Sequence, residues 1–466
     1  MNTKRTGVDF GEKSLEIDVP DHAVVVEFDD PPSLDDPEEA TRKAIASPYG
    51  CAPLAELAKP GMRVAIGFDD PTRPAKTVQT ILPIVIDTLL DAGVGETDIL
   101  LICACSNHRK WTRSELAAYL GPHVFSRFWP SGRIVNHDCS DPSQLVFLGI
   151  SPAGSYYVEL NRDFVEADLM IYVGNVGPSG FRSYTGTGAV IGLASTRSIA
   201  SHHSFHGIRQ LGFATDDPVK KPPHSVKDDL NTQLEKATGK SVFYVNAVTG
   251  VGGKPVGLFA GRCRDVKPPA WELADSIFRI PVPQADVLVV GLPETIAHGS
   301  ADNTLNAAIG VMSPPRFSPA MPVLREGGVV IGLSPSSGYI DPERYPAYQE
   351  VIDLYGRYHS FTALVDHEQE FDNRPAYRHQ YTHGYGYPPL HGFWLLYQCS
   401  FTQSRAGAVI MAGTRNPGAF RALGITPAAD FNQAWKIAER IVGPDPVTVV
   451  APTFWSRRSF KFDVAE

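Results

Sequence analysis

Two short polar segments follow two apolar runs early in the chain. The first is Asp-Asp-Pro-Thr-Arg-Pro at positions 69–74, and the second is Cys-Ser-Asn-His-Arg at positions 105–109. Within them, the imidazole of His108 can exchange a proton near neutral pH while a neighbouring cation holds a carboxylate. Acid, hydroxyl and guanidinium groups accompany it in the sequence. Together the segments indicate an active site for an anionic ligand.

Both segments are predicted to lie where parallel strands end. Residues 63–68 and 99–104 are short apolar runs, and residues 77–92 between them carry apolar side chains at helical spacing. This order is typical of a β-α-β unit, in which ligands gather at the carboxyl ends of the strands. A purely structural role stays open, because Asp70 could cap the following helix and pair with Arg73.

A long, polar Gly/Thr loop over residues 177–192 follows a third apolar strand. Its length favours wrapping a ligand over merely connecting two elements. The GTGAVIG run inside it is a poor dinucleotide fingerprint, because it lies too far beyond the strand end near Gly174 and no acid follows about twenty residues later. Its glycines, with Thr185 and Thr187, suit a loop that holds phosphate through backbone amides.

A dense imidazole cluster follows soon after this loop, formed by His202, His203 and His206. If the segment is helical, His202 and His206 share one face at a spacing that is compatible with metal binding. The acidic residue of an HExxH zinc motif is missing, whereas imidazole combined with sulfur ligands would suit nickel or a similar ion. Structural histidines are the alternative.

The composition indicates a globular protein with more than one core. The chain has 466 residues, of which 43% are hydrophobic, and this length favours two domains. The net charge of −9 and the lack of a long Lys/Arg run argue against nucleic acid or an anionic membrane as the main partner. The six cysteines lack CxxC spacing, and the sequence has neither a signal-peptide core nor a membrane-spanning run. We therefore expect a cytoplasmic protein with reduced thiols.

The predicted fold class is α/β, with two domains that each contain a mainly parallel sheet flanked by helices and with a ligand cleft between them. The first domain is expected over residues 1–275, joined by the C-terminal segment 428–466, and the second over residues 284–427. The proline-rich stretch 268–283 is the hinge candidate. The aromatic and histidine-rich span 377–397 is compatible with a substrate-facing wall, an oligomer contact or an irregular surface segment.

The order of these motifs resembles the nickel-dependent lactate racemase family of 2-hydroxyacid racemases and epimerases. The resemblance covers most of the chain and rests on the segments at 69–74, 107–115, 167–178, the Gly/Thr loop, 198–203, 259–261 and 326–331. In that family a pyridinium nucleotide carrying sulfur groups holds nickel. A hydride passes from the substrate Cα to this cofactor and back, while a histidine takes the hydroxyl proton. The resemblance implies that the cofactor lies in the cleft between the two domains.

The resemblance also implies roles for individual residues. His108 is the implied general acid/base, and Arg73 is implied to contact the substrate or the cofactor. His203 is the implied nickel ligand, with His202 or His206 as alternatives. The other residues implied to bind the cofactor are Asp70, Thr72, Arg182, Thr185, Gly186, Thr187 and Gly188.

Several positions depart from the family pattern. Ser179 stands where a second catalytic histidine is expected, and Ala189 stands where a lysine tethers the cofactor. Any nickel-pincer nucleotide would therefore be held non-covalently. Asn306 and Ile309 stand where the family has a glutamine and a lysine, which removes a cation from the expected carboxylate-binding region.

The missing base leaves two options. One is a single-base epimerase in which the keto intermediate turns over, and the other is a second base from elsewhere, such as Tyr184 or His298. We expect an isomerase for a small 2-hydroxy acid other than lactate, and cations such as Arg182 would suit a dicarboxylate or a sugar acid. Two other functions stay open: a nicotinamide-dependent oxidoreductase that uses the GTGAVIG loop, and a non-catalytic protein that binds a nucleotide or an organic acid.

Overall fold

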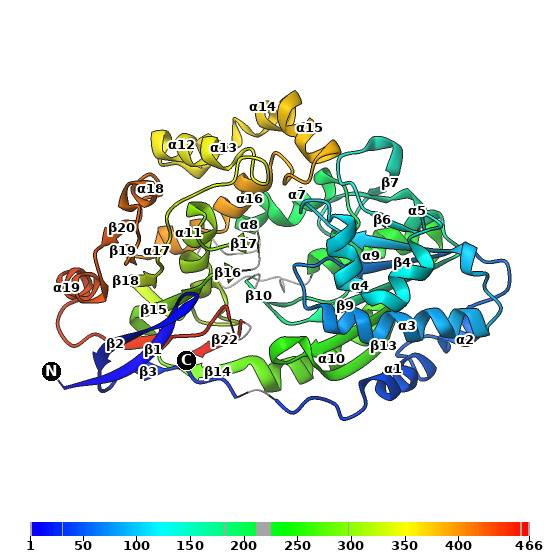
Figure 1. Cartoon of the computed structure of the whole chain (residues 1–466), viewed down its shortest axis with the longest axis horizontal. Helices are drawn as coiled ribbons and strands as arrows, with labels where there is room; N and C mark the ends of the chain where they lie inside the picture. Colours follow the sequence, from blue (N-terminus) through cyan, green and yellow to red (C-terminus); the bar gives the residue numbers. More distant parts are fainter. Residues whose placement is uncertain are drawn as a thin grey trace.

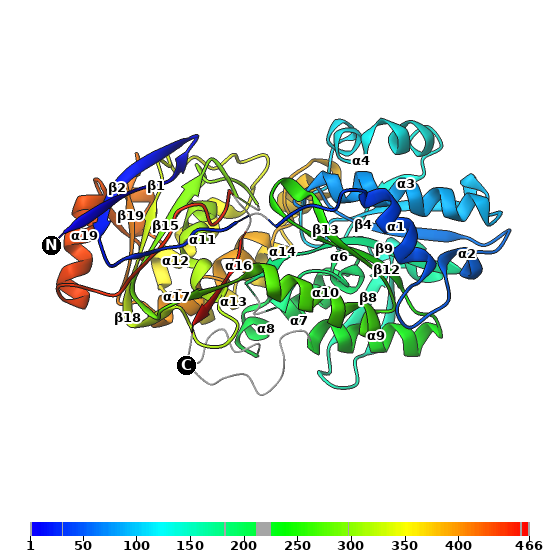
Figure 2. The ribbon, with the colours of Figure 1, turned by 90° about the horizontal axis from the view of Figure 1, so that it is seen from below.

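Two sheets, each covered by helices, lie beside one another in the computed structural model (Figures 1 and 2). The structure describes residues 2–29, 31–180, 183–210, 225–296, 298–456 and 459–464. We call the part built on the first of these sheets the first unit and the part built on the other the second unit. The predicted α/β class is confirmed, because parallel pairing dominates both sheets.

The sheet of the first unit has six strands in the order β13-β12-β9-β4-β5-β6. Only the pairing of β12 with β13 is antiparallel. Its strands are β4 (Val64–Asp69), β5 (Ile99–Ala104), β6 (Ile134–Asn136), β9 (Leu169–Val176), β12 (Phe243–Thr249) and β13 (Pro255–Gly261). The central strands are buried on both faces, which explains why their sequences are almost continuously apolar.

Helices cover both faces of this first sheet. One face packs against α1 (Pro37–Ala46), α2 (Leu54–Leu57), α3 (Ala75–Asp91) and α4 (Arg113–Phe128). The opposite face packs against α9 (Ser225–Thr238) and α10 (Cys263–Phe278). Side chains alternate between the two layers, so that Ile66 and Leu101 join the first and Ala65 and Ile102 the second. The β4-α3-β5 segment is therefore the β-α-β unit that the sequence predicts.

The sheet of the second unit has the order β2-β1-β15-β18-β19-β20, and β21 pairs with both β15 and β3. Helix α11 (Thr304–Met312) packs against one face and α19 (Phe431–Val442) against the other. The strands are β1 (Thr3–Gly11), β2 (Lys13–Pro20), β3 (Val24–Val25), β15 (Ala285–Pro293), β18 (Leu324–Leu333), β19 (Ala408–Ala412), β20 (Thr426–Ala428) and β21 (Thr448–Ala451).

The strand pairing differs from the expected division of the chain. The N-terminal hairpin of β1 and β2 belongs to the second sheet, because β1 pairs with β15. The C-terminal segment also belongs there, since β21 pairs with β15 and not with the first sheet. Its last strand, β22 (Lys461–Val464), pairs with β14 (Arg279–Val282) beyond α10. Free edges of the β15 sheet accept these distant strands, and sequence order alone does not reveal such pairing.

The predicted hinge over residues 268–283 is instead regular structure. Residues 268–278 lie in α10, with Pro268 and Pro269 inside the helix, and residues 279–282 form β14. The helix persists because its apolar face is buried, with Val266 and Ala270 fully covered. The chain passes between the units before α1 and again after α10.

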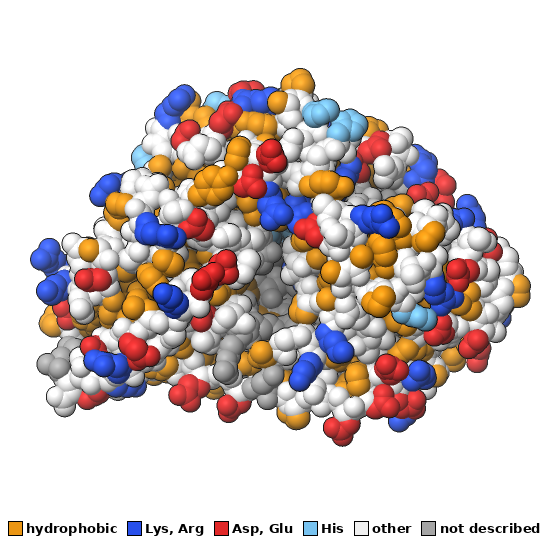
Figure 3. Space-filling view, in the orientation of Figure 1, with side chains coloured by type: hydrophobic (Ala, Val, Ile, Leu, Met, Phe, Trp, Pro, Cys, Tyr) orange, Lys and Arg blue, Asp and Glu red, His pale blue; other side chains and the backbone are white. Residues whose placement is uncertain are grey.

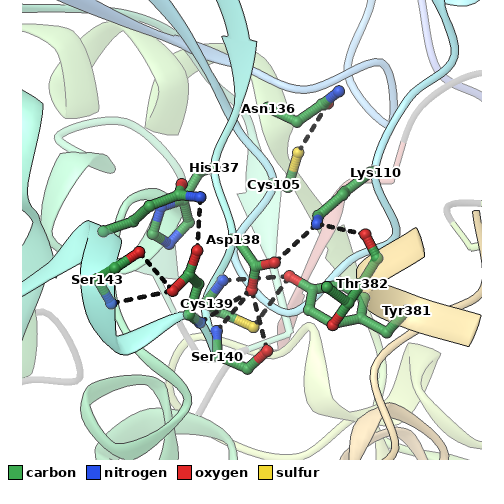
Figure 4. Close-up of polar contacts among 12 residues, drawn as sticks. Cys105, Lys110, Asn136, His137, Asp138, Cys139, Ser140, Ser143, Tyr381 and Thr382 are labelled. Carbon is green, nitrogen blue, oxygen red and sulfur yellow. Dashed lines mark hydrogen bonds and ion pairs between the residues drawn. The ribbon is translucent and has the colours of Figure 1, made fainter. Parts of the chain in front are cut away.

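The aromatic and histidine-rich span 377–397 packs against the first unit. It contains parts of α15 (Pro375–His383) and α16 (His391–Tyr397). Lys110 of the first unit donates to the carbonyl of Thr382 at 3.0 Å and pairs with Asp138 at 2.7 Å, and the amide of Cys139 donates to the Tyr381 hydroxyl at 3.1 Å (Figure 4). The span is therefore a contact between the two units and not an irregular surface segment.

The surface shows no large patch of one charge on the face drawn in Figure 3, where acidic and basic side chains are interspersed. Across the described residues, the structure contains no helix that combines the length and apolar character needed to cross a bilayer.

His137 is a fully buried imidazole, and it directly precedes Asp138 and Cys139, which take part in the contact with residues 377–397. Its Nε2 faces the carbonyl of Ala194 at 2.9 Å, and the amide nitrogen of Asn161 lies 3.3 Å from its Nδ1. Nε2 must donate to the carbonyl and Nδ1 must accept from the amide. The ring therefore carries a single proton and is neutral. Burial lowers the pKa of His137 from 6.5 to about 4, although the Ala194 carbonyl and Asp138 oppose the shift.

This shift predicts acid sensitivity. Between pH 6.5 and 4 the unfolded chain binds a proton at this position that the folded chain does not, so the free energy of unfolding falls as the pH drops, by about 2 kcal/mol at pH 5 from His137 alone. Urea unfolding at pH 7.5 and pH 5 measures the loss, and His137→Gln should lose about 2 kcal/mol less than the wild type. An equal loss in both proteins would contradict this role.

Candidate active site between the two units

A cavity of about 140 Å³ opens at the carboxyl ends of β4, β5 and β9. Its lining includes Asp69, Asp70, Arg73, Asn107, His108, Ser179, Thr185, Gly186, Gly188, His202, His203 and Lys227. The structure thus brings the two polar segments, the Gly/Thr loop and part of the histidine cluster to one place. A larger groove of about 620 Å³ lies beside the strand ends of the second sheet and contains none of these motif residues.

Asp70 is a buried carboxylate that receives several hydrogen bonds. It accepts from the hydroxyl of Thr72, from Nε1 of Trp111 at 3.2 Å and from Nδ1 of His108 at 2.8 Å. Burial raises the pKa of Asp70, but the combined effect of His108, Arg73 and Thr72 is larger and holds it below its usual value. Because Asp70 is ionised, Nδ1 of His108 carries the proton, and Nε2 is left available to a ligand.

The structural alternatives for this segment do not match the geometry. Helix α3 begins after Pro74, with no side chain capping it, so Asp70 is not its cap. Among the described residues no ion pair joins Arg73 to Asp70; Arg73 donates instead to the hydroxyl of Thr72 at 3.2 Å and lines the cavity. Asp69 has the structural role, because it accepts from the Tyr172 hydroxyl at 2.7 Å and fastens β4 to β9.

Arg109, the cation next to His108, is paired with side chains of the protein itself. Arg109 donates to both oxygens of Glu115, at 3.0 and 2.5 Å, and lies 4.0 Å above the ring of Trp111. Burial raises the pKa of Glu115, but hydrogen bonds from Arg109 and Thr112 outweigh it and lower the value to about 2. Glu115 also completes the capping box of α4 with Thr112. Arg109 therefore anchors a helix and does not hold a ligand.

The Gly/Thr loop is shaped by its first residues. Thr185 donates to the carbonyl of Asn175 at 2.7 Å and accepts from the amide of Gly177 at 2.9 Å, which folds the loop back on β9. Gly186 has a φ of +90°, and a Cβ there would lie 2.8 Å from Val176. Thr187 is buried beside the cavity, Ala189 is fully buried at the start of α6 (Ala189–Gly192), and Arg182 lies outside the described residues.

The histidine cluster does not form one helix. Helix α7 (Thr196–His203) ends at Ser204, and α8 (Phe205–Gln210) begins after it. His206 is therefore exposed and does not line the cavity, whereas His202 and His203 do. Burial and the neighbouring His108 lower the pKa of His203 to about 3, so its ring is neutral and suited to ligate a metal ion. The premise that His202 and His206 share a helix face is wrong.

Lys227 on α9 lines the cavity, and no sequence motif points to it. Its Nζ lies 3.4 Å from the carbonyl of Gly186 in the Gly/Thr loop. Burial lowers the pKa of Lys227 to about 8, helped by Lys267 and Arg73 and opposed by Asp69. At neutral pH it is still mainly a cation, and it supplies positive charge where the loop offers backbone amides. In the sequence, α9 has the pattern of an ordinary amphipathic helix. That pattern does not indicate that Lys227 lines a cavity.

The second unit contributes two imidazoles beside His108. His298 follows β16 (Thr295–Ile296), and His391 begins α16. Their ring centroids lie 5.4 and 5.7 Å from that of His108 and 5.3 Å from each other. Burial, followed by the neighbouring imidazoles, lowers the pKa of both rings well below 6.5. His391 lies in the aromatic and histidine-rich span 377–397. The composition of that span is the only feature of the sequence that points to a role for His391.

Other residues hold this pair in place. The carbonyl of His298 accepts from the Tyr345 hydroxyl at 2.9 Å and from the Asn306 amide at 3.4 Å, so Asn306 supports the loop that carries His298. Ile309, on the same helix as Asn306, is buried. Tyr184 points elsewhere, since its hydroxyl donates to Asp275 on α10. Of the two residues considered as a second base, only His298 approaches His108.

Residues 10–211 match the family model described as the lactate racemase N-terminal domain. The chain is also 26% identical over 254 residues to the lactate racemase of Thermoanaerobacterium thermosaccharolyticum and 25% identical over 256 residues to that of Lactiplantibacillus plantarum. Each alignment covers 54% of this chain and 57% of the relative, so the matched region spans little more than half the length of these curated relatives.

Solved structures share the fold over almost the whole chain. The lactate racemase apoprotein from Thermoanaerobacterium thermosaccharolyticum matches with a TM-score of 0.71 and 20% identity, covering 99% of this chain and 100% of its own. A protein from Thermotoga maritima matches with a TM-score of 0.58 and 16% identity, covering 92% and 99%. The chain is thus similar to the lactate racemase N-terminal domain over residues 10–211 and shares its overall fold with a lactate racemase.

Proposed function

We propose that this chain is an isomerase that inverts the configuration of a small 2-hydroxy acid with the help of a nickel-pincer nucleotide. The observation that carries the proposal is the Asp70–His108 pair, which faces a cavity also lined by the Gly/Thr loop and His203. That arrangement joins a proton acceptor, a phosphate-compatible loop and a metal-compatible imidazole in one site. The two curated relatives named above are both lactate racemases.

The residues present fit the cofactor. Backbone amides from Gly186 to Gly188, with Lys227 nearby, suit a nucleotide phosphate. The neutral imidazole of His203 suits nickel, which imidazole and sulfur ligands bind well. A bound cofactor of this kind would supply a reversible hydride acceptor for the substrate Cα. Because Ala189 offers no amine, we propose that the cofactor is held without a covalent link.

His108 takes the hydroxyl proton of the substrate in this proposal. The ionised Asp70 holds the proton on Nδ1 of His108, which leaves Nε2 as the acceptor. The carboxylate also stabilises the imidazolium that forms when the proton arrives. Arg73, which lines the same cavity, holds the substrate carboxylate.

His298 serves as the second base, in place of the histidine that Ser179 replaces. Its ring approaches His108 from the other unit, so the two imidazoles can meet a hydroxyl from different sides. Arg73 and Lys227 provide cations on the first unit, whereas the buried Ile309 provides none on the second. This distribution supports a 2-hydroxy acid with groups beyond those of lactate, such as a dicarboxylate or a sugar acid.

The Asp70–His108 pair should act as one unit. Asp70→Asn and His108→Asn should each lower kcat by roughly 10²- to 10⁴-fold with KM little changed, because each removes the oriented proton acceptor. The double variant should be no slower than the His108 variant alone. Polarimetry of cofactor-loaded protein on a panel of 2-hydroxy acids measures the rates. Asp163→Asn, an exposed carboxylate on the far helix Arg162–Glu166, is the control and should be silent. Additive losses would contradict the pairing.

The two bases should serve opposite enantiomers. In single-turnover experiments with excess loaded protein, the bound 2-keto acid can be trapped after a quench. His108→Asn should prevent its formation from one enantiomer and His298→Gln from the other, since each base faces one position of the hydroxyl. If both variants block the same enantiomer, His298 is not the second base. If neither the variants nor the wild type form any keto acid, the isomerase proposal itself fails.

The cofactor should be present but untethered. Native mass spectrometry should detect a nucleotide bound to the loaded protein, and denaturing mass spectrometry should return the mass of the unmodified chain, because Ala189 cannot form a link. His203→Ala should lose nickel, measured by metal analysis, while it retains the nucleotide. A covalent adduct that survives denaturation would contradict the non-covalent proposal and would direct attention to Lys227.

A further inference from the structure

We propose that His108, His298 and His391 form a binding site for one divalent transition-metal ion such as Zn²⁺ or Co²⁺, distinct in its donors from the nickel ligand proposed at His203. One ligand nitrogen from each of the three rings lies within 4.8 Å of those of the other two. The inference needs neither the nucleotide nor the isomerase activity.

The three rings are steeply inclined to one another, and no two of them are stacked. The interplanar angles are 70° for His108 and His298, 87° for His108 and His391, and 68° for His298 and His391. Steep angles let nitrogen atoms converge on one point, whereas stacking would direct them apart. Around a tetrahedral zinc ion with bonds of about 2.0 Å, nitrogen atoms are about 3.3 Å apart, so a small inward movement of the rings completes the site.

Two ring nitrogen atoms in this cluster are buried without a partner among the described residues, as free ligand positions would be. Within the described part of the chain, Nδ1 of His298 and Nε2 of His391 are buried and have no hydrogen-bond partner. His391 as a whole is 1% exposed. Leaving a polar atom buried and unsatisfied costs roughly 1–3 kcal/mol, and a bound cation would remove that cost.

Two further ring nitrogen atoms contact groups typical of a second coordination shell. Nδ1 of His108 contacts Asp70 at 2.8 Å, and Nδ1 of His391 contacts the hydroxyl oxygen of Tyr348 at 2.6 Å. With a metal on Nε2, each Nδ1 carries the proton and donates it to its oxygen partner. Carboxylate and hydroxyl partners of this kind orient ligating imidazoles in metalloproteins.

Such an ion would join the two units and occupy the proton acceptor. His108 belongs to the first unit, whereas His298 and His391 belong to the second, so the ion would hold the units in the arrangement seen here. It would also take Nε2 of His108, the atom that the proposed isomerisation uses. Metal binding at this site is therefore expected to oppose turnover.

Cobalt titration of the full chain, purified without cofactor, tests the site. Wild-type protein should bind one Co²⁺ per chain and develop the visible absorption of a tetrahedral cobalt centre. His298→Gln and His391→Gln should each weaken binding by roughly a hundredfold or more, and Tyr348→Phe, which removes only an outer partner, by roughly 10- to 100-fold. Thermal unfolding without metal checks that each variant folds, and cobalt should raise the Tm of the wild type but not that of His298→Gln or His391→Gln.

Two control variants separate this site from other histidines. His379→Gln removes one ring of the exposed His379 and His383 pair on α15, and His203→Ala removes the proposed nickel ligand. Both should leave the cobalt spectrum unchanged. The proposal is overturned if wild type binds no cobalt or if folded His298→Gln and His391→Gln variants keep the spectrum. Because no cofactor is used, failure of the isomerase proposal would leave this result intact.

Discussion

The hydrogen bond between the Asp70 carboxylate and Nδ1 of His108 is the interaction on which the candidate site depends. It exists because β4 and β5 run parallel with Asp69 opposite Ala104, so the two turns that follow lie side by side. Thr72 and Trp111 complete the shell of Asp70, and the Glu115–Arg109 pair anchors the turn after His108. Buried charge is tolerated here because each charged group has partners.

The part of the site that follows from local pattern could be predicted from the sequence. The strands β4 and β5 are continuous apolar runs, and the polar residues after them must lie at one edge of a parallel sheet. Lys227 and His391 could not be found in this way, because packing between distant elements places them in the site. The break between α7 and α8 has a local signal that the histidine spacing obscured, because Ser204 accepts from the amide of Gly207 and caps the start of α8.

The changes from the family pattern are spread over both units, yet the fold is kept. Ser179 and Ala189 are small side chains inside the first unit, and Ile309 is buried in a helix of the second. Ala189 and Ile309 are small or apolar side chains that fit the core they join, so the fold accommodates them. From the second unit, His298 and His391 bring two imidazole rings to within 5.7 Å of His108, measured between ring centroids.

The pairing of β1 with β15 also bears on how the protein folds. The first unit is an insertion within the second, because strands from both ends of the chain enter the β15 sheet. During synthesis the first unit can complete its core as soon as α10 has emerged, whereas the second must wait for β21 near the C-terminus. Its N-terminal hairpin therefore waits for β15, its partner strand, until the whole first unit has been synthesised.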